Sequence, residues 1–368
     1  MKTRIRLLSA RLHYEPDIRV FTAASGPVDA LHELYLVLER DDGLRGCAEV
    51  RANITFLTKV PEERVAPAIR ALVDEVTWSA APEDSLDRIF TLAPGHPPIA
   101  RAMVESALVD AIARRDGVPA ATVLGGGWRG PIETNSCLML GSDEVFDRLS
   151  ERFVGEGFRF LKVRFSLDQF DRDFARVARL HERFGERIRL SVDANGAWPP
   201  ETAIAYLRRL EKFGLEYIEQ PTPPGDWDAF CRVGESTSIP LMLDEGLRSD
   251  NDVERLARLG APYLAHLKIV KLGGPRAVVA IARRLRSAGV GMMMGQMNEG
   301  AMATALALHC AMAVRPNHNE LYGCYGLIDD PTSGLSYDGA QVVVANRPGL
   351  GVDFDESQAT VVWEIDKD

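Results

Sequence analysis

The stretch LSVDANGAWPPETAIAYLRRLEKFGLEYIEQP, residues 190–221, contains one complete unit of strand, helix and strand. Short apolar runs lead into Asp193 and Glu219, and between them Ala203 and Leu207 recur at helical spacing. Apolar residues at this period predict an amphipathic helix that packs one face against the strands. The stretch therefore predicts a βαβ unit in which both strands end in a carboxylate.

The same unit repeats through the middle of the chain. Candidate strand ends follow one another at Lys162, Asp193, Glu219, Asp244 and Lys268, with one amphipathic helical segment in each interval. Repeated units of this size without a long linker favour a parallel (β/α) barrel, and an open doubly wound sheet is the alternative. We therefore expect an α/β fold built around a barrel.

The two ends of the chain do not follow this repeat. Before the barrel, the strand-like run Glu33–Leu38 and helical periodicity over 66–76 and 100–114 predict an α+β domain. After about Pro331 the strand-like runs have no helices between them. We predict an α+β domain over 1–128, a barrel over 129–330 and a C-terminal segment, 331–368, that returns to the first domain.

Composition excludes several classes of partner. The formal net charge is -10 and 46% of residues are hydrophobic, so we expect no nucleic-acid partner and a large buried core. No apolar run reaches the length of a membrane span, so we expect no membrane partner either. The 5 cysteines form no CxxC pair, which disfavours a disulfide framework or a zinc site and indicates a reducing cytoplasm.

Three successive strands end in a carboxylate: Asp193, Glu219 and Asp244. In a barrel these ends meet at the C-terminal mouth, where the charges would repel one another unless a cation lay between them. Carboxylate oxygens are the ligands that Mg²⁺ prefers, and Mn²⁺ is the alternative. A single acidic residue at a strand end commonly caps the following helix, but three in succession favour a metal site.

Four motifs, in this order and spacing, resemble the enolase superfamily. They are Val192-Asp193-Ala194-Asn195, Glu219-Gln220-Pro221, Leu243-Asp244-Glu245 and Leu267-Lys268-Ile269-Val270-Lys271-Leu272-Gly273-Gly274-Pro275. The resemblance is to the muconate lactonizing enzyme (muconate cycloisomerase) subgroup of the mandelate racemase–muconate lactonizing enzyme family. It implies a modified TIM barrel of the (β/α)7β type, with an α+β capping domain formed by the N-terminal segment and the C-terminal tail.

The resemblance also implies a reaction. Mg²⁺ held by Asp193, Glu219 and Asp244 would bind a substrate carboxylate, and Lys268 would remove the adjacent α-proton to give an enediolate. The chemistry is consistent, because an α-proton beside a carboxylate is weakly acidic and the developing charge needs a divalent cation. A lysine desolvated near a cation can have its pKa lowered enough to act as the base.

Further residues are assigned by the same resemblance. Asn195 and Glu245 lie beside the metal ligands in sequence, and Glu299 matches an acidic position that could donate a hydrogen bond to the carboxylate, with helix capping as the alternative. The capping-domain residues Thr22, Arg51 and Asn53 are expected to line the substrate pocket, with Arg51 as a second anion contact. A small carboxylate substrate and a homo-oligomer are implied as partners.

The segment FLKVRFS, residues 160–166, departs from the family. Lys162 and Arg164 share one strand face and resemble the Lys-x-Lys element, but Arg164 stands where the second lysine transfers protons. Arginine stays protonated, so it is a poor base and a good carboxylate clamp. We therefore predict one-base chemistry by Lys268, as β-elimination (dehydration) or isomerisation, with Lys162 and Arg164 as contacts of the substrate carboxylate and electrostatic stabilisers. Lys271 has the opposite strand parity and is predicted to face outward or to cap the next helix.

Two alternatives stay open at this point. A cycloisomerase, racemase or epimerase could use Arg164 in place of the second lysine. A non-catalytic barrel that binds a metal or another ligand is the alternative from a different class.

Overall fold

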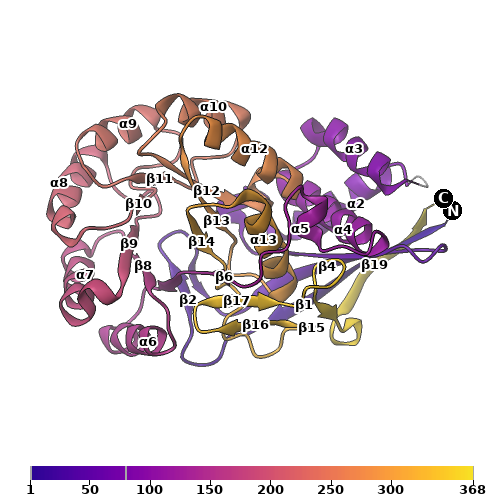
Figure 1. Cartoon of the computed structure of the whole chain (residues 1–368), viewed down its shortest axis with the longest axis horizontal. Helices are drawn as coiled ribbons and strands as arrows, with labels where there is room; N and C mark the ends of the chain where they lie inside the picture. The colour runs from indigo at the N-terminus through magenta and orange to yellow at the C-terminus, as the bar shows by residue number, and fades with distance from the viewer. Residues whose placement is uncertain (1, 79–80, 368) are drawn as a thin grey trace.

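A barrel of parallel strands forms the larger part of the protein (Figure 1). The structure is a computed structural model and describes residues 2–78 and 81–367. Each strand of the 8-stranded sheet pairs in parallel with its neighbour in the sheet. The strands are, in sheet order, β14 (His318–Glu320), β13 (Gly291–Gly295), β12 (Leu264–Lys268), β11 (Leu241–Leu243), β10 (Ile218–Glu219), β9 (Arg189–Asp193), β8 (Phe160–Arg164) and β7 (Ser136–Leu138). The predicted α/β barrel is confirmed.

The two edge strands of this sheet are joined through residues just before β7. The backbone N–H of Asn135 donates to the carbonyl of Asn319 at 3.0 Å, and the backbone N–H of Leu321 donates to Thr134 Oγ1 at 2.7 Å. These bonds bring β7 and β14 together. Because β8 and β12 are four strands apart in the sheet order, they lie on opposite sides of the barrel.

Helices between the strands cover the outside of the barrel (Figure 1). They are α6 (Asp143–Gly155), α7 (Phe170–Phe184), α8 (Pro200–Leu210), α9 (Trp227–Glu235), α10 (Asp250–Leu259), α12 (Pro275–Ser287) and α13 (Ala301–Val314). Local signals set their starts: Pro200 opens α8, and Ser249 and Asp252 form a capping box at α10. The apolar stripe predicted from Ala203 and Leu207 is buried against the strands.

The α+β domain contains an antiparallel sheet in the order β19 (Thr360–Lys367), β1 (Thr3–Leu12), β4 (Leu31–Arg40) and β5 (Arg45–Arg51). Helices α2 (Glu62–Glu75), α3 (Pro82–Leu92) and α4 (Pro98–Arg115) belong to the same domain (Figure 1). The last strand, β19, pairs with β1, so the end of the chain joins the N-terminal domain.

The rest of the C-terminal segment pairs elsewhere. Strand β17 (Gln341–Val344) pairs with β16 (Leu335–Asp338) and with β6 (Ile132–Glu133), and not with the N-terminal sheet. The domain boundaries at 128 and 330 stay predictions. Within the part of the chain that the structure describes, no helix is both long and apolar enough to cross a bilayer.

Candidate active site

The three strand-end carboxylates converge at the C-terminal mouth of the barrel. Asp193 ends β9, Glu219 ends β10 and Asp244 directly follows β11, and all three side chains are buried. The parallel register places Glu219 beside Asp193. Directly after the first two strands, Asn195 and Gln220 adopt positive φ angles of 47° and 39°. This left-handed backbone, uncommon for residues with a side chain, turns the chain away from each strand end.

Each carboxylate faces a cation. Arg164 Nη1 pairs with Asp193 Oδ2, Lys162 Nζ lies 2.9 Å from Glu219 Oε2, and Lys268 Nζ lies 2.6 Å from Asp244 Oδ2. Charges removed from water at this depth need such partners. The mouth is therefore a network of buried ion pairs.

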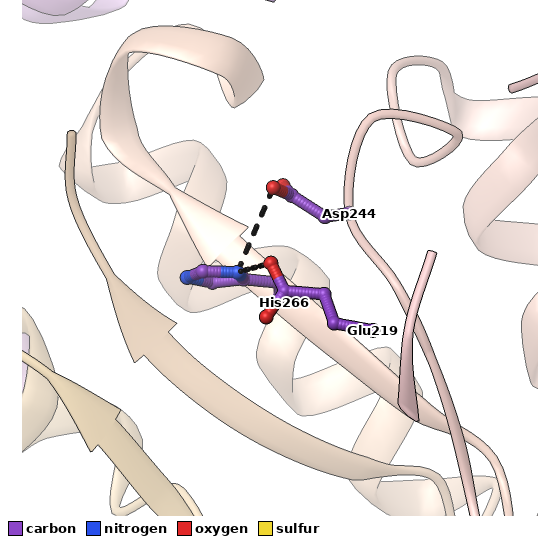
Figure 2. Close-up of side chains that lie close together, drawn as sticks. All are labelled: Glu219, Asp244 and His266. Carbon is purple, nitrogen blue, oxygen red and sulfur yellow. Dashed lines mark hydrogen bonds and ion pairs between the residues drawn. The ribbon is translucent and has the colours of Figure 1, made fainter. Parts of the chain in front are cut away.

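His266 joins the carboxylates from β12 (Figure 2). Its Nδ1 lies 2.9 Å from Glu219 Oε1 and 3.8 Å from Asp244 Oδ2, so the ring is next to both carboxylates. Glu219, Asp244 and His266 form the group of potential metal ligands that the described residues bring together, whereas Asp193 faces Arg164. Sequence reasoning missed His266. The available signal was strand parity, because His266 and Lys268 are two residues apart and share a face.

Lys162 points into the barrel beneath the mouth. Its Nζ forms ion pairs with Glu219 and with Glu320 at the end of β14, and lies 3.5 Å from Asp193 Oδ2. The lysine is fully buried. Its charge therefore supports the carboxylates, and Glu320 is a second participant that the sequence analysis did not identify.

Lys271 was predicted to face outward or to cap the next helix, and the outward position is wrong, because its side chain is buried. Its buried Nζ donates to the carbonyl of Asp244 at 2.7 Å, to Asp244 Oδ1 at 2.8 Å and to the carbonyl of His266 at 2.9 Å. The strand ends at Lys268 and a short helix, α11 (Ile269–Leu272), begins. Helical spacing replaces strand alternation at this point, which brings Lys271 to the same side as Lys268.

The ion pairs shift the acid–base properties of the site. Burial raises the pKa of Asp193 and of Glu219, whereas Lys268 and Lys271 overcome burial and hold the pKa of Asp244 well below its usual range. Burial by itself would lower the pKa of Lys268, but Asp244 raises it above the usual value. This differs from the expectation of a lowered lysine pKa, because the nearest charge in this structure is a carboxylate.

Asn195 connects several of these groups. Its backbone N–H donates to Asp193 Oδ1 at 2.8 Å, its Nδ2 donates to Glu245 Oε1 at 3.1 Å, and its Oδ1 accepts from Arg164 at 3.3 Å. Glu245 is buried, and burial together with Asp244 raises its pKa to about 7. Asn195 and Glu245 therefore lie in contact with the carboxylate network.

A pocket opens above this network, between the two domains. Its lining combines Val20, Thr22, Ser25, Arg51, Phe56 and Leu57 with Arg164, Asn195, Asp244, Glu245, Lys268, Met297 and Asn298. Arg164 on β8 and Lys268 on β12 enter it from opposite sides of the barrel. A ligand in this pocket would therefore lie between an arginine and a lysine.

The remaining predicted pocket residues differ in position. Thr22 and Arg51 line the pocket, whereas Asn53 accepts a hydrogen bond from Arg51 Nε at 2.6 Å and so fixes the guanidinium. Arg51 also donates to the carbonyl of Asn298 at 3.2 Å. Glu299 is buried and accepts from the backbone N–H of Met297 at 3.0 Å, and burial raises its pKa. Glu299 therefore contacts Met297 of the pocket lining and is not itself one of the lining residues.

Known proteins share both this sequence and this fold. The sequence model of the family described as "Enolase C-terminal domain-like" matches residues 144–358. L-Lys-D/L-Arg epimerase of Methylococcus capsulatus is 31% identical over 95% of this chain and 99% of the relative. The crystal structure of muconate lactonizing enzyme from Pseudomonas fluorescens with muconolactone has a TM-score of 0.88 and 26% identity, covering 96% of each chain. The dipeptide epimerase from M. capsulatus with Mg and the dipeptide L-Arg-D-Lys has a TM-score of 0.83 and 26% identity, covering 96% of this chain and 100% of that chain.

Proposed function

Because the chain belongs to the enolase C-terminal domain-like family, as an enzyme of the mandelate racemase–muconate lactonizing enzyme group, we propose that it performs one-base chemistry. Lys268 removes the α-proton of a small carboxylate with the help of Mg²⁺. The observation that carries this proposal is that Lys268 and Arg164 lie on opposite sides of one pocket. Of these two groups, lysine can lose its proton and arginine cannot.

The donor set fits Mg²⁺. Asp193, Glu219 and Asp244 offer buried carboxylate oxygens at three successive strand ends, and hard oxygen donors are what this ion prefers. A Mg complex of the dipeptide epimerase neighbour supports the assignment. When bound, the ion supplies positive charge to the substrate carboxylate as the α-proton leaves.

The side chains have separate tasks in this reaction. Lys268 accepts the proton at Nζ, which requires its ion pair with Asp244 to open and its amine to be neutral. Arg164 remains charged, because Asp193 raises its pKa well above the usual value against the effect of burial. It therefore orients the substrate and stabilises negative charge. Lys162 provides a fixed positive charge beneath Glu219.

The proton taken by Lys268 then has two possible fates. In β-elimination the electron pair expels a leaving group from the β-carbon, such as a hydroxide that takes a proton from solvent to become water, and the abstracted proton stays on the lysine until solvent removes it. In isomerisation the same lysine returns the proton to another carbon on its own side of the substrate. Both outcomes need one base, and neither inverts the α-carbon.

A second candidate function is epimerisation. The L-Lys-D/L-Arg epimerase relative favours it, since it covers nearly the whole of this chain. Inversion requires an acid or base on each face of the α-carbon, and the group opposite Lys268 is Arg164. An arginine held by Asp193, Asn195 and Cys137 is positioned as a donor of hydrogen bonds and not as a base.

Proton NMR in D₂O with added Mg²⁺ tests the proposal. The probes are L-Lys-L-Arg, its L-D epimer, cis,cis-muconate and a series of 3-hydroxy carboxylates. We expect either exchange of the α-proton with retention or formation of an elimination product, and we expect Lys268→Ala to abolish both. Lys212→Ala, a lysine outside the site, is the control. Inversion of the α-carbon by the wild-type enzyme would contradict one-base chemistry and favour the epimerase.

We also propose a cytoplasmic homo-oligomer. The free thiols Cys47, Cys137, Cys231, Cys310 and Cys324 support a reducing compartment. Light scattering of the purified protein tests the oligomeric state.

A further inference from the structure

We propose that a cleft in the N-terminal domain binds a compact polyanion, either a phosphorylated small molecule or a polycarboxylate. The cleft has a volume of about 560 Å³ and lies between the turn that joins β4 to β5, the C-terminal end of α4 and the C-terminal segment. A volume of this size suits a small molecule. The proposal goes beyond the proposed function, because it involves none of the residues assigned to catalysis.

Strand β5 separates this cleft from the active site. Arg45, the first residue of β5, lines the cleft, whereas Arg51, the last residue, lines the pocket above the carboxylates. A strand rises about 3.4 Å per residue, so these two residues are roughly 20 Å apart. The cleft is therefore a second site and not an extension of the active site.

Arginine dominates the lining of the cleft, although the net charge of the chain is -10. The five arginines of the lining are Arg40, Arg45, Arg114, Arg115 and Arg347. Two acidic residues also line the cleft, and each is already paired: Asp42 with Arg40 at 2.7 Å, and Asp353 with Arg347 at 2.6 Å. The lining therefore carries more positive than negative charge, and a concave surface of one sign concentrates ligands of the other sign.

The guanidinium group of Arg114 is fixed in place. Its Nε donates to Asp110 Oδ2 at 2.8 Å, and Asp110 is fully buried. The same carboxyl group accepts from the backbone N–H of Cys47 at 2.9 Å and of Leu350 at 2.8 Å, so it joins β5, α4 and the C-terminal segment. Nη1 and Nη2 of Arg114 have no partner among the described residues, which leaves both available to an anion.

Two further arginines keep donors available. Arg45 is paired through Nε and Nη2, and Arg347 is paired through Nη2. In the part of the chain that the structure describes, Nη1 of each has no partner. The side chains of Arg45, Arg114 and Arg347 are 45%, 33% and 40% exposed, so a ligand can reach them. Arg115 is paired through all three guanidinium nitrogens and contributes charge alone.

The helix dipole explains only part of this arrangement. Arg114 and Arg115 lie in the last turn of α4, where cations offset the negative end of the helix. Arg45 belongs to a strand and Arg347 follows β17, so this explanation does not apply to them. Guanidinium donors from three segments line one cleft, and guanidinium groups form paired hydrogen bonds with phosphate and carboxylate oxygens. The geometry therefore favours a ligand with several negative charges.

Calorimetry with pyrophosphate and with citrate tests the site. The protein is freed of metal on a chelating resin, because soluble chelators are themselves polyanions. The variants are Arg114→Gln, Arg347→Gln and the control Arg258→Gln, which replaces an exposed arginine of α10 that pairs with Glu254. We expect saturable binding by wild type, a loss of about tenfold or more in each cleft variant, and no change in the control.

Two further comparisons make the result specific. Arg114→Gln leaves the buried Asp110 without its cation, whereas Arg347→Gln breaks only an exposed ion pair, so the second variant keeps the test independent of how the first one folds. Lys268→Ala separates the cleft from the active site, whose cations also attract anions, and it should leave binding at the cleft unchanged.

Tighter binding of pyrophosphate would indicate a phosphorylated ligand, and tighter binding of citrate would indicate a polycarboxylate. The proposal is overturned if neither probe binds saturably, if both cleft variants keep the affinity of the wild type, or if Arg258→Gln loses as much affinity as they do. Loss of binding in Lys268→Ala would assign the anion to the active site and also overturn the proposal. None of these outcomes changes the proposed function.

Discussion

At the scale of single residues, the proposed one-base chemistry depends on Arg164. Its guanidinium contacts Asp193, Asn195 and Cys137, so both its charge and its orientation are fixed. A side chain held in this way can clamp a carboxylate but cannot accept a proton at neutral pH. Of the two cations that face each other across the pocket, Lys268 can therefore accept a proton and Arg164 cannot.

Arg164→Lys tests this asymmetry. The change places an amine, which can titrate, opposite Lys268, so we predict that the variant inverts the α-carbon of a chiral substrate that the wild type exchanges with retention. Chiral chromatography of the product, together with NMR exchange rates, measures the effect. Arg164→Gln is the control, because it removes the charge without adding a base, and it should weaken carboxylate binding without inversion. Inversion by Arg164→Gln would show that the second acid or base lies elsewhere.

The sequence predicted some of these residues and missed others for a physical reason. The sequence analysis could identify four of them because each ends or follows a recognisable strand: Asp193, Glu219, Asp244 and Lys268. His266 lies inside an apolar strand, and its only local signal was that it shares a strand face with Lys268. Lys162 was expected to contact the substrate carboxylate, and its burial between Glu219 and Glu320 depends on a strand that is distant in sequence.

At the scale of secondary-structure elements, the change from strand to helix after Lys268 shapes the site. Strand alternation up to Lys268 places His266 and Lys268 inward, and the helical turn of α11 then brings Lys271 inward as well. Three residues of one segment therefore face Asp244. The βα repeat was predictable because its period is regular, but this local change of period was not, and neither was the pairing of the short strands β17 and β6.

Gly295→Ala tests how β13 supports the neighbouring strand. A Cβ atom there would meet His266 Nε2, so we predict that the ring moves away from Glu219, that Mg²⁺ binding weakens about tenfold, and that the melting temperature falls. Gly291→Ala on the same strand is the matched control, because its Cβ would lie 3.1 Å from the flexible side chain of Leu264. Calorimetry and thermal unfolding measure both variants. An unchanged Mg²⁺ affinity in Gly295→Ala would show that the ring position does not matter for the metal.

At the scale of the whole molecule, the site depends on contact between the barrel and the N-terminal domain. The pocket takes Thr22 and Arg51 from one domain and Arg164 and Lys268 from the other. A second contact lies at α4, where Glu105 Oε1 accepts from the backbone N–H of Arg276 at 2.7 Å, in the first turn of α12. A helix start carries unpaired N–H donors and a partial positive charge, so a carboxyl group from the other domain is a suitable cap.

The protonation of Glu105 should make stability depend on pH. Burial raises the pKa of Glu105 from 4.5 to about 7, although the bond from Arg276 acts in the opposite direction. Between these two values the folded protein binds more protons than the unfolded chain. The free energy of unfolding is therefore greatest below the lower value and decreases as the pH rises to about 7, by at most about 1.4 kcal/mol per pH unit for this group.

Glu105→Gln should reduce this dependence, because glutamine keeps an oxygen that can accept from Arg276 and has no proton to lose. Urea unfolding in the presence of EDTA, from pH 5 to pH 8, gives the slope for each protein. Because the pKa of Glu245 is also raised to about 7, part of the slope of the free energy of unfolding against pH should remain in Glu105→Gln. Glu182→Gln, which replaces an exposed glutamate of α7, should match the wild type. An identical slope in wild type and Glu105→Gln would mean that Glu105 is already ionised across this range, and that the contact between the domains tolerates the charge.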